Sequence, residues 1–162
     1  MSVHVTFVCT GNICRSPMAE KIAAQALERA GLSDRVRLTS AGTGSWHVGD
    51  PMDPRAAAEL GAHGYSEQHR ARTVDEDILG ADLVVALDDS HRRALVRLGV
   101  PADRLVLLRS FDPAADPDAE VADPYYGPES GFTEVRTQIE AAVPGLVDRV
   151  RTLLPGSDDY AV

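Results

Sequence analysis

Four short apolar segments stand out along the chain, and segments with helical spacing lie between them. The first apolar segment, residues 3–8 (V-H-V-T-F-V), is rich in β-branched and aromatic side chains and predicts a buried strand. Further strands are predicted over residues 36–39, 82–87 and 104–108. Continuous apolar strands, in place of strictly alternating ones, are typical of a sheet that is covered on both faces.

Helices are predicted between these strands. In residues 17–30 apolar side chains recur with helical spacing, and Gly31 ends the helix. Ser16 and Pro17 suit its N-cap and first helical positions. Three later segments also predict helices: residues 54–63, residues 90–98 and residues 132–154. We expect the last of them to break at Pro144. Strands that alternate with helices predict an α/β fold with a parallel sheet and helices on both faces.

Two of the connecting loops are long and rich in Gly or Pro. Residues 40–53 carry Trp46, and residues 111–131 hold four prolines and many acidic side chains. Neither loop has the length of a linker between domains, and no repeat or low-complexity tract divides the chain. We therefore expect a single domain over residues 1–155, followed by a frayed tail at residues 156–162.

The segment after the first strand has the features of an anion site. In open α/β sheets, ligands bind at the carboxyl ends of strands, and Cys9 lies at such an end. Gly11 and Asn12 suit a tight turn, in which successive N–H groups converge near the start of a helix and cradle a tetrahedral anion. Arg15 adds a planar guanidinium that can hold two phosphate oxygens. The residues predicted to bind phosphate are Thr10, Gly11, Asn12, Ile13, Cys14, Arg15 and Ser16.

Cys9 has the predicted surroundings of a nucleophile. A helix start and a nearby arginine both favour the thiolate form of a cysteine. The spacing C-x5-R alone is a weak signal, but the strand before it, the Gly-Asn turn within it and the helix after it make chance a poor explanation. A Walker phosphate loop is excluded, because no Gly-Lys-Ser/Thr follows the glycine. The alternative is a buried structural Cys9 in a tight turn.

Composition and charge exclude several classes of protein. The chain has 162 residues, of which 44% are hydrophobic and 25% charged, as in an ordinary soluble domain. The net charge of −9 and the lack of a long basic run argue against nucleic-acid partners. No apolar run approaches the roughly 20 residues of a membrane span. The N-terminus lacks the cationic region of a signal peptide, so we expect a cytoplasmic protein, with export by another route left open.

The residues around Cys9 resemble the signature loop of the low-molecular-weight protein tyrosine phosphatases. Residues 8–17 read V-C-T-G-N-I-C-R-S-P. The resemblance extends over nearly the whole chain, and its other matching segments are Ser40-Ala41-Gly42-Thr43, Asp53-Pro54-Arg55-Ala56, His69-Arg70-Ala71-Arg72, Leu87-Asp88-Asp89-Ser90 and Asp123-Pro124-Tyr125-Tyr126. The Ala- and Arg-rich composition is similar to that of actinobacterial members. The resemblance implies a four-stranded parallel sheet flanked by helices on both faces, with the phosphate-binding loop between the first strand and the first helix.

The resemblance also implies a second catalytic group, Asp123. Release of a tyrosine phenolate, whose parent phenol has a pKa of about 10, requires a proton donor. The family places an Asp followed by Pro on a mobile loop for this purpose, and Asp123-Pro124 matches that pattern. On composition alone, Asp123 is one acid among many in a solvated loop. In the implied mechanism Cys9 attacks phosphorus, Arg15 and the loop amides hold the oxygens, and Asp123 acts first as acid and then as base.

Supporting roles follow from the same resemblance. Ser16 is expected to donate its hydroxyl to the sulfur of Cys9, as well as or instead of capping the helix. Asn12, Ser40 and His69 are expected to hold the loop in shape, although a lone histidine is more often a surface residue. The residues expected to line the substrate pocket are Thr10, Trp46, His47, Tyr125 and Tyr126.

The two cysteines are too few for a disulfide scaffold or a structural zinc site. Cys14 is expected either to trap oxidised Cys9 as a reversible disulfide or to pack the loop as a small buried residue. No metal or organic cofactor is implied, because the cradle and Arg15 already supply positive charge.

Three other functions compete with a tyrosine phosphatase. An arsenate reductase of the same fold needs cysteines beyond Cys14. A protein-arginine phosphatase of the same family carries Thr where this chain has Ile13, and the apolar Ile suits a tyrosine phosphatase better. A non-catalytic phosphotyrosine-binding module needs neither Cys9 nor Asp123. The sequence therefore predicts a protein-tyrosine phosphatase that acts on phosphotyrosine-containing proteins and favours the monomeric state.

Overall fold

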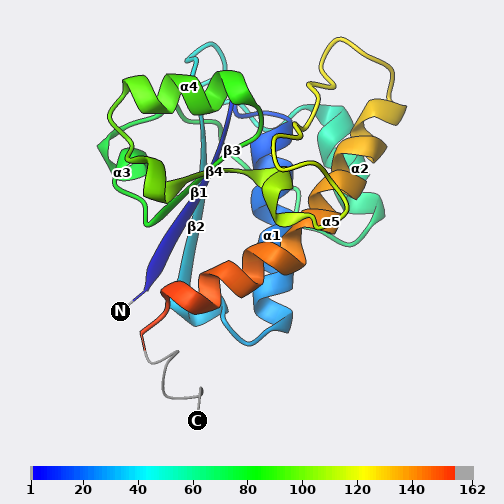
Figure 1. The fold of residues 1–162 in the computed structure, drawn as a ribbon. Helices are drawn as coiled ribbons and strands as arrows, with labels where there is room; N and C mark the ends of the chain where they lie inside the picture. The colour runs from blue at the N-terminus through cyan, green and yellow to red at the C-terminus, as the bar shows by residue number, and fades with distance from the viewer. Residues whose placement is uncertain (1, 156–162) are drawn as a thin grey trace.

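The computed structural model describes residues 2–155, whose four strands form one parallel sheet with helices on both of its faces (Figure 1). The strands are β1 (Val3–Cys9), β2 (Val36–Gly42), β3 (Leu83–Ala86) and β4 (Leu105–Leu107), in the spatial order β2-β1-β3-β4. Every neighbouring pair is parallel. The predicted fold class is confirmed. The predicted tail, residues 156–162, lies outside the described residues.

The helices divide between the two faces of this sheet (Figure 1). On one face are α1 (Arg15–Arg29), α2 (Pro54–Ala62) and α5 (Ser130–Leu153), and on the other are α3 (Glu76–Leu79) and α4 (Asp89–Arg97). Short 3-10 turns cover Ser33–Arg35, Ala102–Arg104 and Leu108–Phe111. The sequence did not predict α3, because four residues are too few to show helical periodicity. Within residues 2–155, no helix has both the length and the apolar character needed to cross a membrane.

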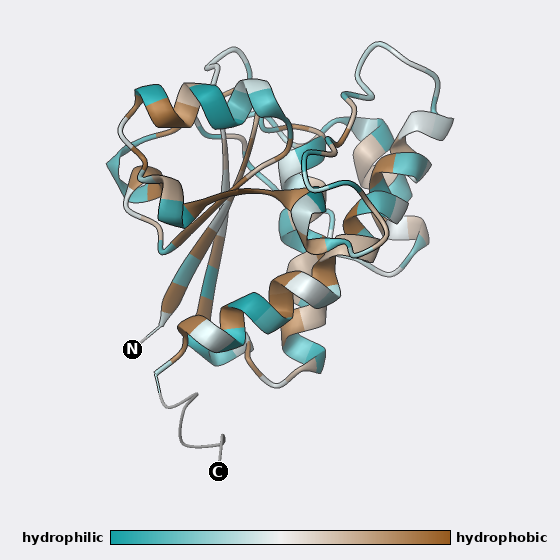
Figure 2. Cartoon of the chain, in the orientation of Figure 1, coloured by the Kyte–Doolittle hydropathy of each residue, from teal (hydrophilic) through white to brown (hydrophobic). Residues whose placement is uncertain are grey.

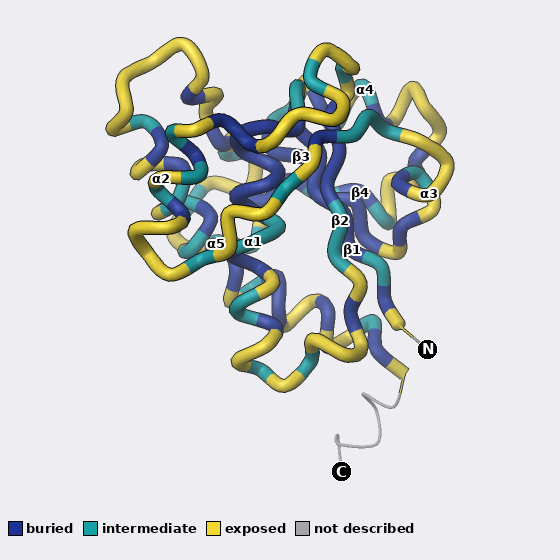
Figure 3. Tube along the Cα trace, turned by 180° about the vertical axis from the view of Figure 1, so that it is seen from behind, coloured by how far each residue is buried: buried dark blue, intermediate teal, exposed yellow. Residues whose placement is uncertain are grey.

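Two hydrophobic cores lie on opposite faces of the sheet, as the side-chain alternation of β1 requires. Val5 and Phe7 pack into the larger core, beside α1 and α5, whereas Val8 packs into the smaller one with Ile78 of α3 and Leu95 of α4. Figure 2 shows the hydrophobic residues gathered along the strands, and Figure 3 shows the same segments buried between the helical layers. This double cover explains why the strands are apolar on both sides.

Helix α5 does not break at Pro144, contrary to the prediction from the sequence. A proline inside a helix removes one backbone hydrogen bond and costs about 3 kcal/mol. Side chains on both sides of Pro144 are nonetheless buried in the larger core, among them Ile139, Val143, Leu146 and Val147. Burial of four such side chains offsets the lost hydrogen bond, so the helix continues through the proline.

We expect Gly145→Ala to destabilise the protein, although alanine usually favours a helix over glycine by about 1 kcal/mol. A Cβ atom at position 145 would overlap the carbonyl oxygen of Phe111 and lie 3.1 Å from its Cβ atom. Crowding of this kind costs about 1–3 kcal/mol, which urea denaturation measures. Gly131→Ala in the same helix is the control, since its nearest atom would be Pro124 Cβ at 3.4 Å. Equal stability of the two variants would contradict this packing.

Candidate active site

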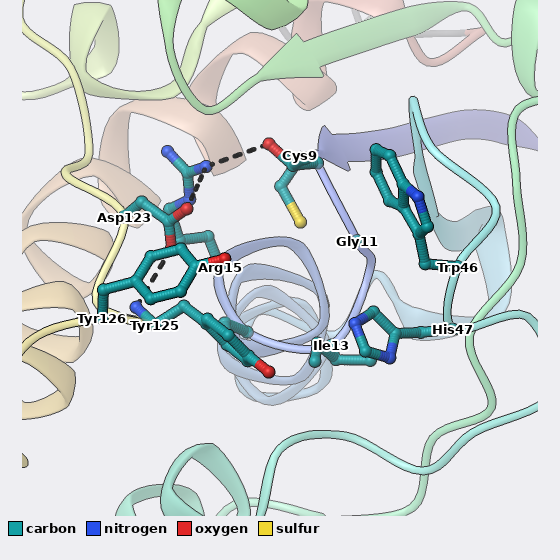
Figure 4. Close-up of a pocket in the computed structure, with 11 residues that line it drawn as sticks. Cys9, Gly11, Ile13, Arg15, Trp46, His47, Asp123, Tyr125 and Tyr126 are labelled. Carbon is teal, nitrogen blue, oxygen red and sulfur yellow. Dashed lines mark hydrogen bonds and ion pairs between the residues drawn. The ribbon is translucent and has the colours of Figure 1, made fainter.

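A cavity of about 350 Å³ opens where β1 ends and the loop before α1 begins (Figure 4). Cys9 is the last residue of β1, and its side chain points into this cavity although the residue is only 3% exposed. The residues that line the cavity are Cys9, Thr10, Gly11, Ile13, Cys14, Arg15, Trp46, His47, Asp123, Tyr125 and Tyr126. The structure thus brings every residue predicted for the substrate pocket to the same opening as Cys9.

The carbonyl groups of this loop make hydrogen bonds that are directed away from its centre, and the N–H groups of the same peptides point inward. The carbonyl oxygens of Cys9 and Thr10 accept from the two N–H groups that directly follow β2, at 2.9 Å each, and that of Ile13 accepts from Asp53 N–H at 2.8 Å. Because the C=O and N–H of a trans peptide point in opposite directions, the N–H groups of the same peptides face the centre of the loop. A ring of inward N–H groups is a binding site for a tetrahedral anion.

Asn12 holds the turn of this loop. It has a φ of 58°, a left-handed conformation that Asn tolerates better than most residues. Its Nδ2 donates to Ser16 Oγ at 2.8 Å and to Ser40 Oγ at 2.9 Å, while its Oδ1 accepts from the backbone N–H of Arg72 at 2.9 Å. The Nε2–H of His69 donates to the backbone carbonyl of Asn12 at 2.7 Å. Burial lowers the pKa of His69, which keeps this ring neutral.

Ser16 contacts Cys9 and does not cap the helix. Helix α1 begins at Arg15 with Cys14 as its N-cap residue and no capping side chain, so the predicted N-cap is wrong. The physical reason is that the Ser16 hydroxyl is already engaged: Oγ accepts from Asn12 Nδ2 and lies 2.8 Å from Cys9 Sγ. Because the Nδ2 group of Asn12 can only donate, the hydroxyl proton of Ser16 is free to be donated to the sulfur.

Arg15 is buried at the cavity, and hydrogen bonds to residues far away in the sequence fix its guanidinium group. Its Nη1 donates to Asp88 Oδ2 and to the backbone carbonyl of Val121, each at 2.8 Å. Burial acts to raise the pKa of Asp88, but hydrogen bonds from Ser90 and Arg15 hold it at about 2. The arginine is therefore paired with an ionised carboxylate, as a buried cation must be.

Within residues 2–155, no group of three or more His, Cys, Asp and Glu side chains is arranged to hold a metal ion.

Aromatic rings and an acid surround the opening (Figure 4). Asp123, with its side chain 45% exposed, has Oδ2 at 3.7 Å from Arg15 Nη2. Trp46 is 76% and Tyr126 93% exposed, and Figure 4 shows them on opposite sides of Cys9. The rings of Tyr125 and Tyr126 meet edge to face, with centroids 4.8 Å apart. These rings give the opening apolar walls that suit a flat ligand.

Residues 4–154 match the protein family described as "Low molecular weight phosphotyrosine protein phosphatase". The chain belongs to this family. It is therefore an enzyme of the protein-tyrosine phosphatase class, a hydrolase, and the resemblance identified in its sequence is confirmed.

Relatives of this phosphatase are similar over most of their length. Low molecular weight protein-tyrosine phosphatase A of Mycobacterium tuberculosis is 60% identical over 149 residues, which cover 91% of each chain. A low molecular weight protein-tyrosine-phosphatase of Streptomyces coelicolor is 50% identical, with 96% of this chain and 98% of the relative covered. The crystal structure of a protein tyrosine phosphatase from Entamoeba histolytica superposes with a TM-score of 0.87 at 30% identity, covering 93% of this chain and 98% of that one.

Cys14 lines the same cavity of the phosphatase, and both Cys9 and Cys14 are free thiols. Burial, with a contribution from the Asp53 carboxylate, raises the pKa of the Cys14 thiol. A protonated thiol is a poor nucleophile towards an oxidised partner. A disulfide with Cys9 stays a prediction, and the raised pKa favours the packing role.

Sequence reasoning did not assign roles to three residues of this phosphatase that contact the segment of residues 9–16. Asp88 and the Val121 carbonyl hold Arg15, and His91 Nε2 lies 2.8 Å from Thr10 Oγ1. The signal for Asp88 and His91 was present as the spacing Asp-x-x-His at the start of a helix, where the two side chains form a capping box. Such a spacing indicates a helix start and carries no information about which loop it faces.

Proposed function

We propose that this phosphatase hydrolyses phosphotyrosine in proteins through a phosphocysteine intermediate on Cys9. One observation carries the proposal: the Cys9 sulfur points into a cavity between inward-facing amides and the Arg15 guanidinium, with a Ser16 hydroxyl at 2.8 Å. An anionic nucleophile and an anionic substrate both need such a positive site.

In the first step the Cys9 thiolate attacks phosphorus, a P–S bond forms and the P–O bond to the tyrosine ring breaks. The loop N–H groups and Arg15 hold the three non-bridging oxygens, and Asp123 gives its proton to the leaving phenolate. In the second step water attacks phosphorus, Asp123 accepts the proton of that water, and Cys9 leaves as a thiolate stabilised by the Ser16 hydroxyl. The products are a tyrosine and inorganic phosphate.

The walls of the cavity support tyrosine as the phosphorylated residue. The indole and phenol rings of Trp46, Tyr125 and Tyr126 flank the opening, and the apolar side chain of Ile13 lines it. A phenyl ring buries apolar area against such walls, whereas a phosphoserine offers one methylene group. All the residues assigned here belong to one chain, so we propose that a single domain of a single copy is sufficient for catalysis.

The test compares peptides of identical flanking sequence that carry phosphotyrosine, phosphoserine or phosphoarginine. We expect kcat/KM to favour phosphotyrosine by at least about 100-fold, because the other side chains lack the ring that the walls contact. Ile13→Thr is the matched variant, and it is expected to narrow the gap between phosphotyrosine and phosphoarginine. Hydrolysis of phosphoarginine at the higher rate by the wild type would make the protein an arginine phosphatase.

A further inference from the structure

Thr10 directly follows Cys9, and its hydroxyl lies within hydrogen-bond distance of a buried histidine, His91, that does not line the cavity. His91 lies in the first turn of α4, is 1% exposed, and places Nε2 at 2.8 Å from Thr10 Oγ1. This contact joins two side chains that are 81 positions apart, across the adjacent strands β1 and β3. It is separate from the contacts of Asn12 and Ser16.

The hydrogen bonds of His91 fix the position of its ring proton. Its Nδ1 lies 3.2 Å from the backbone N–H of Asp88. Asp88 Oδ1 lies 3.3 Å from the same nitrogen, but it already accepts from Ser90 Oγ and from the His91 backbone N–H. The Asp88 backbone N–H can only donate, so Nδ1 accepts and carries no proton. Burial, together with the nearby charge of Arg15, lowers the pKa of His91 to about 4, so the ring is neutral at pH 7. A neutral ring without a proton on Nδ1 must carry it on Nε2, which therefore donates to Thr10.

The Thr10 hydroxyl can then make one further hydrogen bond, in which it is the donor. It accepts from His91 Nε2–H, and Arg15 Nη2 donates to it at 3.5 Å. A hydroxyl oxygen has two acceptor lone pairs and one proton, so both lone pairs are engaged and the proton must be donated elsewhere. Thr10 lines the cavity above Cys9. A ligand in this cavity is therefore an acceptor within reach of the hydroxyl proton.

We infer that Thr10 Oγ–H is an additional hydrogen-bond donor to the phosphoryl group and that His91 is the positioning residue that sets its direction. The inference rests on the proposed function, which places the phosphoryl group over Cys9. Asp88 takes part in the same arrangement: its Oδ2 holds Arg15, and its Oδ1 accepts from the backbone N–H of His91 at 3.2 Å. The N-cap residue and the first turn of α4 thus contact two side chains of the cradle.

The competing explanation is that His91 only caps α4, and the two roles use different ring nitrogens. His91→Asn keeps an acceptor near the Nδ1 position, so it preserves the capping bond and loses the contact with Thr10. His91→Gln reaches the Nε2 position with its amide, so it preserves donation to Thr10 and loses the cap. A positioning role and a capping role therefore predict opposite orders for these two variants.

We expect His91→Asn to lower kcat/KM for an aryl phosphate about tenfold and to raise the Ki of inorganic phosphate by a similar factor, as for loss of one hydrogen bond to a charged group. His91→Gln is expected to recover most of that loss. Thermal unfolding should show the reverse order, with His91→Gln the less stable because it lacks the cap. Full activity of His91→Asn, or greater loss in His91→Gln, would overturn the inference.

Thr10 variants test the same bond from its exposed end, where folding is less at risk. Thr10→Val keeps the shape without the hydroxyl and is expected to match the loss in His91→Asn, while Thr10→Ser recovers it. The double variant Thr10→Val/His91→Asn should be no worse than either single variant, and wild-type rates for Thr10→Val would refute the role. Cys9→Ser is assayed in parallel. If this variant is active, the proposed function fails. If it is inactive and His91→Gln is nonetheless less active than His91→Asn, only the role of His91 is refuted.

Discussion

Cys9→Ser will lower kcat/KM for a phosphotyrosine peptide by at least about 10⁴-fold, while the cavity still binds inorganic phosphate. Removal of the nucleophile in another covalent enzyme costs on the order of a millionfold. A serine hydroxyl stays protonated at neutral pH and has no adjacent base to activate it, since the neighbour of Cys9 Sγ is the hydroxyl of Ser16. Steady-state kinetics measures the loss.

Calorimetric titration with phosphate supplies the control for the Cys9→Ser variant. The amides and Arg15 are held by Asn12, Asp88 and the Val121 carbonyl, not by the sulfur. Binding should therefore survive the substitution. A variant that keeps its activity would show that the nucleophile is another residue. A wild type that binds phosphate without hydrolysing any phosphopeptide would make the protein a reader of phosphotyrosine.

The fold was predictable because its signals are local. The pattern of residues 3–8 predicts a buried strand and that of residues 17–30 predicts a helix, and neither prediction needs the rest of the chain. The break expected at Pro144 was wrong because local propensity is weaker than the burial of the side chains around it. The order β2-β1-β3-β4 is non-local and was not predicted from the sequence, since the family resemblance implied only a parallel sheet of four strands.

In the candidate site, too, the contacts within one segment could be predicted and those between distant segments could not. Residues 9–16 are contiguous and run from the last residue of β1 into the start of α1, so the proposed cradle and nucleophile could be predicted together. The partners of Arg15 could not, because Asp88 reaches it only once β3 pairs with β1. The role of Ser16 as a cap failed for a related reason: its hydroxyl is taken by Asn12 and Cys9, a competition that spacing alone does not show. The roles assigned to these residues stay predictions until variants are measured.

The dependence on the leaving group will decide the role of Asp123. Its Oδ1 accepts from the Tyr125 backbone N–H at 3.1 Å, and its Oδ2 lies 3.7 Å from Arg15 Nη2. Asp123→Asn keeps the acceptor for Tyr125 and the shape of the side chain but cannot protonate a phenolate. We expect kcat/KM for a phosphotyrosine peptide to fall about 10²–10⁴-fold, the usual contribution of a general acid.

Aryl phosphates with more acidic phenols need less help from a proton donor, so the loss in Asp123→Asn should shrink as the phenol becomes more acidic. With the most acidic phenols, attack by Cys9 stays fast while hydrolysis of phosphocysteine slows, because the base is also missing. A rapid burst of phenol, equal to the enzyme concentration, should then precede a slow steady state. A loss of the same size for every leaving group would show that Asp123 does not protonate it.

The pH profile gives a second readout of the same Asp123→Asn variant. In the wild type we expect a bell-shaped kcat/KM, since the first step needs Cys9 ionised and Asp123 protonated. One limb of this bell depends on the proton of Asp123, so the profile of Asp123→Asn should keep a single limb. A wild-type profile that is flat between about pH 5 and 8 would contradict the pairing. A bell with both limbs in the variant would assign the acid to another group at the opening.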